Sequence, residues 1–226
     1  ERSFPSTNEL PWTLSALASW SKADTTWTDE AGRTTDLNDL TDHAWMRLST
    51  ETSFISTAMA KGELFTKRGQ GIFTFTCGGA HLIQGVSHAR ARGFGHKSFD
   101  GPFSHQLKLL AFRFPIEMAQ IDAGREQHKQ FRDQLLVQRL KLAGHTLETF
   151  ARLAASGHES APTSGALSVY ADEIVESVKL LNSAGVFERL DALQATDEQL
   201  YLDVVGDSAH ALRGIRIATG TGPVYY

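Results

Sequence analysis

The sequence predicts an all-α protein, a helical bundle of about six helices preceded by an irregular, tryptophan-rich N-terminal arm. The main evidence is the recurrence of apolar residues at three- and four-residue steps over about 36–60 and again over about 127–156. Strand-like alternation is confined to one short segment, IFTFT at 72–76. Hydrophobic residues make up 41% of the chain and charged residues 21%, a balance typical of a folded protein with a buried core.

Residues 1–35 form the expected arm. Trp12, Trp20 and Trp27 lie there among small polar residues and helix breakers. Three tryptophans in an irregular segment need other groups to cover them. We therefore expect the arm to pack on the body of the protein, with a short helix at 12–20.

The first long helix is expected at 36–60, where the apolar residues form one stripe, and Gly62 is its expected C-cap. The segment TKRGQG at 66–71 then has the composition of a loop. IFTFT at 72–76 fits either a short strand or the entry to the next helix.

The central helices are expected at Cys77–Arg92, at 104–122 and at 127–156, with the second bent near Pro115. The loop GFGHKSFDGP at 93–102 separates the first two, because its glycines and proline disfavour regular structure.

The clearest linker is SGHESAPTSG at 156–165. After it, helices are expected at 164–183 and 186–194. The segment TDEQ at 196–199 fits a capping box, in which Thr and Gln side chains satisfy free backbone N–H groups, and it starts a helix that ends near Arg213.

These elements divide the chain into three parts. Residues 1–35 are the irregular arm, and 36–157 are the main helical domain, which carries the pentapeptide CGGAH. Residues 164–226 are a C-terminal helical segment, which either stands apart or packs on the same core.

The composition excludes several classes of function. A net charge of −4 and a pI near 6.1 give no overall attraction to nucleic acid. No apolar run approaches the roughly 20 residues of a membrane-spanning helix. A single cysteine rules out an internal disulfide. The Thr/Ser/Trp-rich opening is typical of an exported, mature N-terminus, so we expect a periplasmic or secreted protein.

The only cysteine, Cys77, begins the pentapeptide CGGAH, which ends at His81. Residues four apart lie on the same face of a helix, so the sulfur and the imidazole would point the same way. Gly78 and Gly79 would each cost roughly 1 kcal/mol in a helix interior relative to alanine. The close approach of another backbone or of a flat ligand would compensate for that cost.

CGGAH resembles the haem-attachment motif of c-type cytochromes, with Ala80 in place of the second cysteine. The resemblance implies that Cys77 forms a single thioether to haem c and that His81 is the proximal iron ligand. Gly78 and Gly79 would let the porphyrin lie close to the helix. The implied function is electron transfer with a redox partner protein.

Residues beyond the pentapeptide complete the expected haem site. His88 shares the helix face of His81. Arg90 and Arg92 are suited to pair with the haem propionates, because guanidinium groups bind carboxylates through two hydrogen bonds. The sixth position of the iron is either open or filled by one of Met59, His43, His88, His96 and His105.

Other forms of chemistry are compatible with CGGAH. Cys77 and His81 are good ligands for a non-haem metal ion such as zinc, completed by distant His or Glu residues. The pentapeptide is also similar to the CGGTH metal motif of the alanyl-tRNA synthetase editing domain. That family needs an upstream His-x-x-x-His pair, whereas the only upstream histidine here is His43. A cysteine nucleophile assisted by histidine is a further alternative.

The sequence is also compatible with the absence of any chemistry. Cys77 would then be a small buried hydrophobe, and the chain a helical accessory subunit that docks onto a larger assembly through exposed aromatic residues.

Two acidic residues are further candidates for a functional role. Glu51 is expected at the edge of an apolar stripe with a solvated tip. Glu148 and His145 have the i, i+3 spacing of helix-bundle metal sites, but because such sites need two pairs, we expect a solvated helix face.

Overall fold

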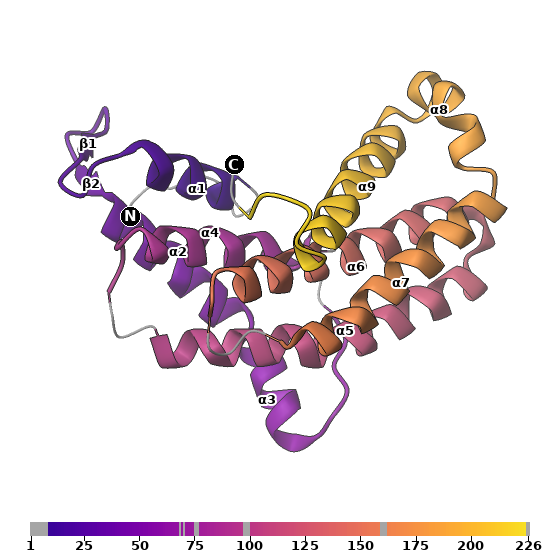
Figure 1. Ribbon diagram of the computed structural model, residues 1–226, viewed down its shortest axis with the longest axis horizontal. Helices are drawn as coiled ribbons and strands as arrows, with labels where there is room; N and C mark the ends of the chain where they lie inside the picture. Colours follow the sequence, from indigo (N-terminus) through magenta and orange to yellow (C-terminus); the bar gives the residue numbers. More distant parts are fainter. Residues whose placement is uncertain are drawn as a thin grey trace. The chain divides into compact units, whose positions relative to one another are not determined.

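The all-α class is confirmed. In the computed structural model, the described part of the chain contains nine α-helices and one two-stranded hairpin, with 76% helix and 3% strand (Figure 1). The expected count of about six helices is therefore too low. The structure describes residues 9–67, 69, 71–74, 77–96, 100–158 and 162–224, with backbone alone at 100, 101 and 164.

The chain divides into two compact units, Glu1–Leu109 and Leu110–Tyr226, and the division falls within helix α5 (Asp100–Gln127). The elements of the first unit that precede α5 are α1 (Leu10–Trp20), β1 (Thr26–Thr28), β2 (Thr34–Asp36), α2 (Leu37–Glu51), α3 (Ser53–Lys61), a 3-10 turn (Gly71–Thr74) and α4 (Ala80–Ala91).

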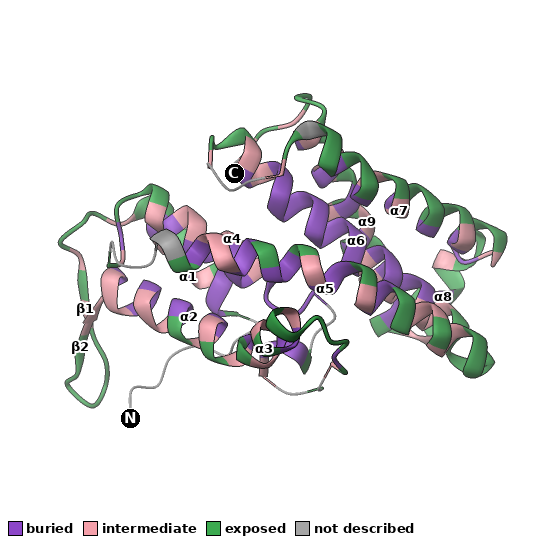
Figure 2. Cartoon of the chain, turned by 90° about the horizontal axis from the view of Figure 1, so that it is seen from below, coloured by how far each residue is buried: buried purple, intermediate pink, exposed green. Residues whose placement is uncertain are grey.

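The second unit is a helical assembly around one buried helix. After α5 it contains α6 (Arg132–Ala155), α7 (Ser164–Ser183), α8 (Leu190–Thr196) and α9 (Glu198–Ala218). Helix α6 packs against both α7 and α9. Most of its residues between Leu136 and Leu153 are buried, so this helix forms the core of the unit (Figure 2).

The expectation of an irregular arm is wrong for its described residues, 9–35. Helix α1 occupies the first part of this segment and buries Leu10, Leu14 and Ala18, which are spaced four apart along one face. The short helix expected at 12–20 therefore begins two residues earlier, and its apolar face accounts for its stability.

A hairpin of β1 and β2 follows α1, in a segment that was expected to be irregular. The strands pair antiparallel. The carboxylate of Asp29 accepts hydrogen bonds from the backbone N–H groups of Ala31 and Arg33, at 3.0 and 2.9 Å. The connecting segment lacks the two-residue Asn-Gly or Asp-Gly signal of the common tight hairpins, so residue patterns alone do not indicate it.

The single helix expected at 36–60 is two helices, because α2 ends at Glu51 and α3 begins at Ser53. Thr52 lies at the break. Its hydroxyl oxygen is 2.8 Å from the carbonyl oxygen of Leu48 and 3.0 Å from Oε1 of Gln106. The predicted C-cap is confirmed, since Gly62 adopts the left-handed conformation with φ of 67°.

The capping box expected at 196–199 is displaced by one residue. Thr196 belongs to the end of α8, and Asp197 is the N-cap of α9. The carboxylate of Asp197 accepts a hydrogen bond of 3.1 Å from the backbone N–H of Leu200. Among the described residues, no helix combines the length and the apolar character needed to cross a bilayer, as the sequence predicts.

Candidate metal centre

The helix that carries His81 begins later than the sequence predicts. Helix α4 starts at Ala80, and Cys77–Gly79 form a turn before it, in which the N–H of Ala80 donates to the carbonyl of Cys77 at 3.0 Å. Gly78 and Gly79 have φ of 47° and 89°, a left-handed conformation that is incompatible with a continuous right-handed helix. The expectation that Cys77 and His81 share a helix face is therefore wrong.

The turn also accounts for the glycines without a flat ligand. A Cβ atom on Gly79 would lie 2.9 Å from Cδ1 of Ile72 and 3.2 Å from Cδ1 of Leu48. A larger residue would therefore be disfavoured by its backbone conformation and by apolar neighbours. The cost that a helix interior would impose does not arise, because neither glycine lies in a helix.

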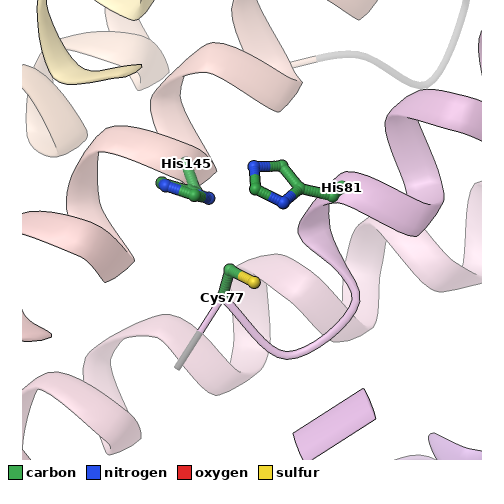
Figure 3. A group of neighbouring side chains, drawn as sticks. All are labelled: Cys77, His81 and His145. Carbon is green, nitrogen blue, oxygen red and sulfur yellow. The ribbon is translucent and has the colours of Figure 1, made fainter. Parts of the chain in front are cut away.

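The turn nevertheless brings the two candidate ligands close together. The Sγ atom of Cys77 lies within 4.8 Å of a ring nitrogen of His81. Cys77 is 8% exposed and His81 is half-buried. Figure 3 draws Cys77 on the turn and His81 at the start of α4. A thiolate and an imidazole at this separation are a ligand pair suited to a soft transition-metal ion.

Glu51 fixes the segment that leads to Cys77, so the expectation of a solvated tip is wrong. Its carboxylate accepts the backbone N–H of Ile72 and forms an ion pair with Arg47, and its side chain is only 15% exposed. The side chain of Ile72 in turn contacts the position of Gly79. Glu51 on α2 thus helps to hold in place the segment whose Ile72 side chain contacts the turn.

The remaining residues expected at a haem site have other neighbours. His88 Nε2 lies 2.9 Å from Oγ of Ser19. Arg90 donates a hydrogen bond of 2.6 Å to the carbonyl of His96. Arg92 is exposed at the C-cap of α4. Each arginine lies at the C-terminal end of α4, whereas Cys77 precedes the N-terminal end.

The residues expected as a sixth iron ligand are spread over four helices and one loop: His43, Met59, His88, His96 and His105. His43 is on α2, where burial and the charge of Arg47 lower the pKa of its imidazole. Met59 is on α3, and Nε2 of His105 on α5 lies 2.8 Å from Oγ of Ser56. Within the described ranges, four of the expected histidines lie outside the group of potential metal ligands that contains Cys77 and His81. These are His43, His88, His96 and His105.

A second cluster of ionisable side chains lies inside the second unit, between α6 and α9. His145 Nε2 is 3.2 Å from Oδ1 of Asp207, and His210 Nδ1 is 2.6 Å from Oε2 of Glu148. The two histidine rings are 4.1 Å apart. The sequence does carry a pattern that indicates this cluster. Asp207 and His210 are three residues apart, like His145 and Glu148, but their acidic residue is aspartate and not glutamate.

Glu148 has no exposed surface, so the expectation of a solvated helix face is wrong. Burial alone would raise the pKa of its carboxyl. The hydrogen bond from His210 and the charge of Arg152 outweigh that effect and lower the pKa of Glu148 to about 2. Arg152 donates to Oε1 at 2.6 Å, and Arg213 lies 3.4 Å from the same oxygen. Glu148 is therefore the anionic centre of a structural ion network.

Asp207 is perturbed in the opposite direction. Burial raises the pKa of its carboxyl to about 7, although the charge of Lys141, 3.5 Å away, opposes the shift. Burial also lowers the pKa of His145, and the charge of His210 adds to that effect. Since arginine and lysine side chains already neutralise the carboxylates of this cluster, it has the character of an ion network and not of a cation site.

Helices α6 and α9 approach closely where each carries a glycine. A Cβ atom on Gly144 would lie 3.0 Å from the backbone N of Ala211, and one on Gly214 would lie 2.9 Å from the backbone N of Glu148. These contacts between backbones bring the charged side chains of the two helices within hydrogen-bond distance of one another.

No protein-family model, curated protein or solved structure matches the chain.

Proposed function

We propose that the protein binds a transition-metal ion, zinc in the first place, through the thiolate of Cys77 and the imidazole of His81. The observation that carries this proposal is the short separation of the two ligand atoms, within 4.8 Å. Zinc–sulfur and zinc–nitrogen bonds of about 2.3 and 2.1 Å place two such atoms about 3.6 Å apart in a tetrahedral site.

The surroundings favour a bare ion over haem. A porphyrin needs an open face beside the glycines, whereas Ile72 and Leu48 already occupy the space next to Gly79. The single-thioether haem, with electron transfer and a redox partner, stays a prediction with less support than the ion. Export to the periplasm or beyond the cell likewise stays a prediction.

The burial of the turn supports a structural role for the ion. Cys77, Gly78, Gly79 and Ala80 are all buried. Burial is typical of structural zinc sites, whereas catalytic zinc keeps one position open to water or substrate. Bound metal would tie the turn to the first residues of α4 and thereby stabilise the first unit.

Cobalt substitution tests the proposal on the reduced full chain. Thiolate ligation of Co²⁺ gives an intense charge-transfer band near the ultraviolet, and tetrahedral geometry gives strong visible bands. We expect both bands with the wild type, and their loss in Cys77→Ser and His81→Asn. His88→Asn is the matched control, because His88 is on the same helix but bonded to Ser19.

The number of ligands is a separate question for the same assay. Two protein ligands do not complete a tetrahedral shell, and the intensity of the visible bands measures how closely the bound ion approaches tetrahedral geometry. Wild-type protein that gives no thiolate-to-cobalt band would refute the metal site. A Soret band and an added mass of one haem on Cys77 would instead establish the cytochrome-like alternative.

A second candidate function, that of an accessory subunit, is favoured by one surface of the second unit. Leu202, Val205 and Leu212 on α9 are 53%, 47% and 59% exposed and lie on one face of the helix. Affinity purification compares the wild-type chain with a Leu202→Ser/Leu212→Ser variant. A partner held by the wild type and lost by the variant supports docking, and identical co-purification contradicts it.

A further inference from the structure

Helix α1 covers the histidine of the proposed metal site. The ring of Trp12 lies against the ring of His81, with centroids 4.6 Å apart and the planes tilted by 56°. Trp12 is 39% exposed, so one part of the indole faces water while another contacts the imidazole. His81 therefore has an apolar neighbour from a separate helix.

The contact is part of close packing along α1 and α4. A Cβ atom on Gly85 would lie 2.9 Å from the carbonyl oxygen of Pro11 and 3.0 Å from its Cα. The backbone of α1 thus rests directly on α4, one helical turn beyond His81. At the other end of the contact, Ser19 and His88 lie within hydrogen-bond distance. The position of Trp12 is consequently set by the docking of α1 as a whole.

We infer that α1 controls metal exchange at the Cys77–His81 site, with Trp12 as the residue that positions His81. This inference rests on the proposed metal site. The indole restricts rotation of the imidazole, so less conformational freedom is lost when the metal binds. It also keeps water from one side of the ligand, and the apolar shell of a metal site controls solvent access.

The test uses Co²⁺ as the probe and two readouts on the reduced full chain: the dissociation constant from the absorption bands, and the rate at which a chelator removes the ion. Substitutions around a ligand typically change metal affinity by 10–100-fold. We expect Trp12→Ala to weaken Co²⁺ binding by about tenfold and to accelerate chelator-driven release by a similar factor. Trp12→Phe keeps an aromatic ring and restores most of the affinity.

Two further variants separate positioning from general loss of structure. Trp20→Ala is the matched control, because Trp20 is on the same helix and 89% exposed, and it leaves both readouts unchanged. Gly85→Ala displaces α1 from α4 while Trp12 and both ligands remain, and it accelerates release as Trp12→Ala does. Far-UV circular dichroism confirms that each variant retains its helix content.

The outcomes distinguish the two proposals. Suppose that the wild type binds Co²⁺ and that Trp12→Ala has the same dissociation constant and the same release rate. The inference that α1 controls metal exchange is then wrong, whereas the proposed metal site is not affected. If Trp12→Ala unfolds, a second measurement is used in its place: the quenching of tryptophan fluorescence by Co²⁺ in the wild type and in Trp12→Phe. Quenching that is absent from Trp12→Phe supports the inference, and quenching that persists there overturns it. A wild type that binds no Co²⁺ refutes the metal site itself.

Discussion

Glu148 illustrates how a buried charge depends on its partners. Its carboxylate has no exposed surface and is surrounded by three basic side chains, Arg152, His210 and Arg213. Removing one member of a buried ion network leaves the others desolvated and uncompensated, which usually costs more than the network itself contributes. The second unit therefore depends on this residue more than on any exposed ion pair.

We predict that Glu148→Gln lowers the free energy of unfolding by about 3–5 kcal/mol, because Arg152 and Arg213 lose their buried counter-charge. Urea denaturation followed by circular dichroism measures the change. The control is Glu126→Gln, which removes an ion pair with Lys129 whose side chains are 65% and 69% exposed, and it is expected to have a much smaller effect, because water screens exposed pairs. Equal effects of the two substitutions would contradict the importance of burial.

Asp207 provides a pH-dependent prediction of known sign. Its pKa is about 7 in the folded protein and near 3.8 when unfolded, so the folded state holds the proton more tightly. The resulting stability is complete below about pH 4 and is lost as pH rises through about 7. Glu148 has the opposite sign, since its pKa is lowered to about 2, and its contribution is lost as pH falls from 4.5 towards 2.

Asp207→Asn removes the ionisable carboxyl group and should therefore eliminate the loss of stability that accompanies its ionisation. Between pH 4 and pH 8 the variant is expected to gain stability relative to the wild type, by up to an amount on the order of 4 kcal/mol. Urea midpoints across that range measure the difference. The ionisable groups that face Asp207 are present in both proteins: Lys141, His145, Asp203 and His210. A constant difference at every pH would show that Asp207 is ionised throughout.

At the scale of elements, the contact between α6 and α9 depends on the absence of side chains. We predict that Gly214→Ala destabilises the protein by about 1–3 kcal/mol, because the added methyl group would meet the backbone of Glu148 at 2.9 Å. Gly206 offers a control on the same helix, with nothing within 4 Å of its added Cβ. There alanine should stabilise by about 0.5–1 kcal/mol through helix propensity. Thermal unfolding that ranks the two variants in the reverse order would disprove the close approach.

The helices that were predicted accurately are those whose apolar pattern and boundaries are both local. Helix α7 matches the expected range, 164–183, and Gly62 ends α3 as predicted. The apolar pattern continues through the break at Thr52 and does not indicate it, and one contact of Thr52 is with Gln106, which is distant in sequence. The start of α4 was placed too early because apolar periodicity does not reveal the two left-handed glycines in the turn.

Of the residues expected at the site, the structure brings together Cys77 and His81, and their role as ligands stays a prediction. Cys77 and His81 were identified from their spacing and chemistry, and they do lie close together, although a turn and not a helix face brings them there. The spacing of His145 and Glu148 alone does not reveal the buried network around Glu148, because the second pair is formed by aspartate and comes from a helix 62 residues away from the first. Contacts between distant helices depend on packing, which sequence periodicity does not specify.

At the scale of the whole molecule, the chain consists of two compact units, and the proposed ligands Cys77 and His81 belong to the first. A metal that binds only the folded state stabilises it in proportion to the logarithm of its concentration over the dissociation constant. We predict that zinc at about 100 times that constant adds about 2.7 kcal/mol to the stability of the first unit. Differential scanning calorimetry with zinc and with a chelator measures the shift. Cys77→Ser should show none.

Native mass spectrometry of the reduced full chain after zinc addition is the most direct test of the metal site. The account predicts one zinc ion retained per wild-type and His88→Asn chain, and none on Cys77→Ser or His81→Asn. Wild-type protein that remains metal-free, or a Cys77→Ser chain that retains the same ion, would contradict it.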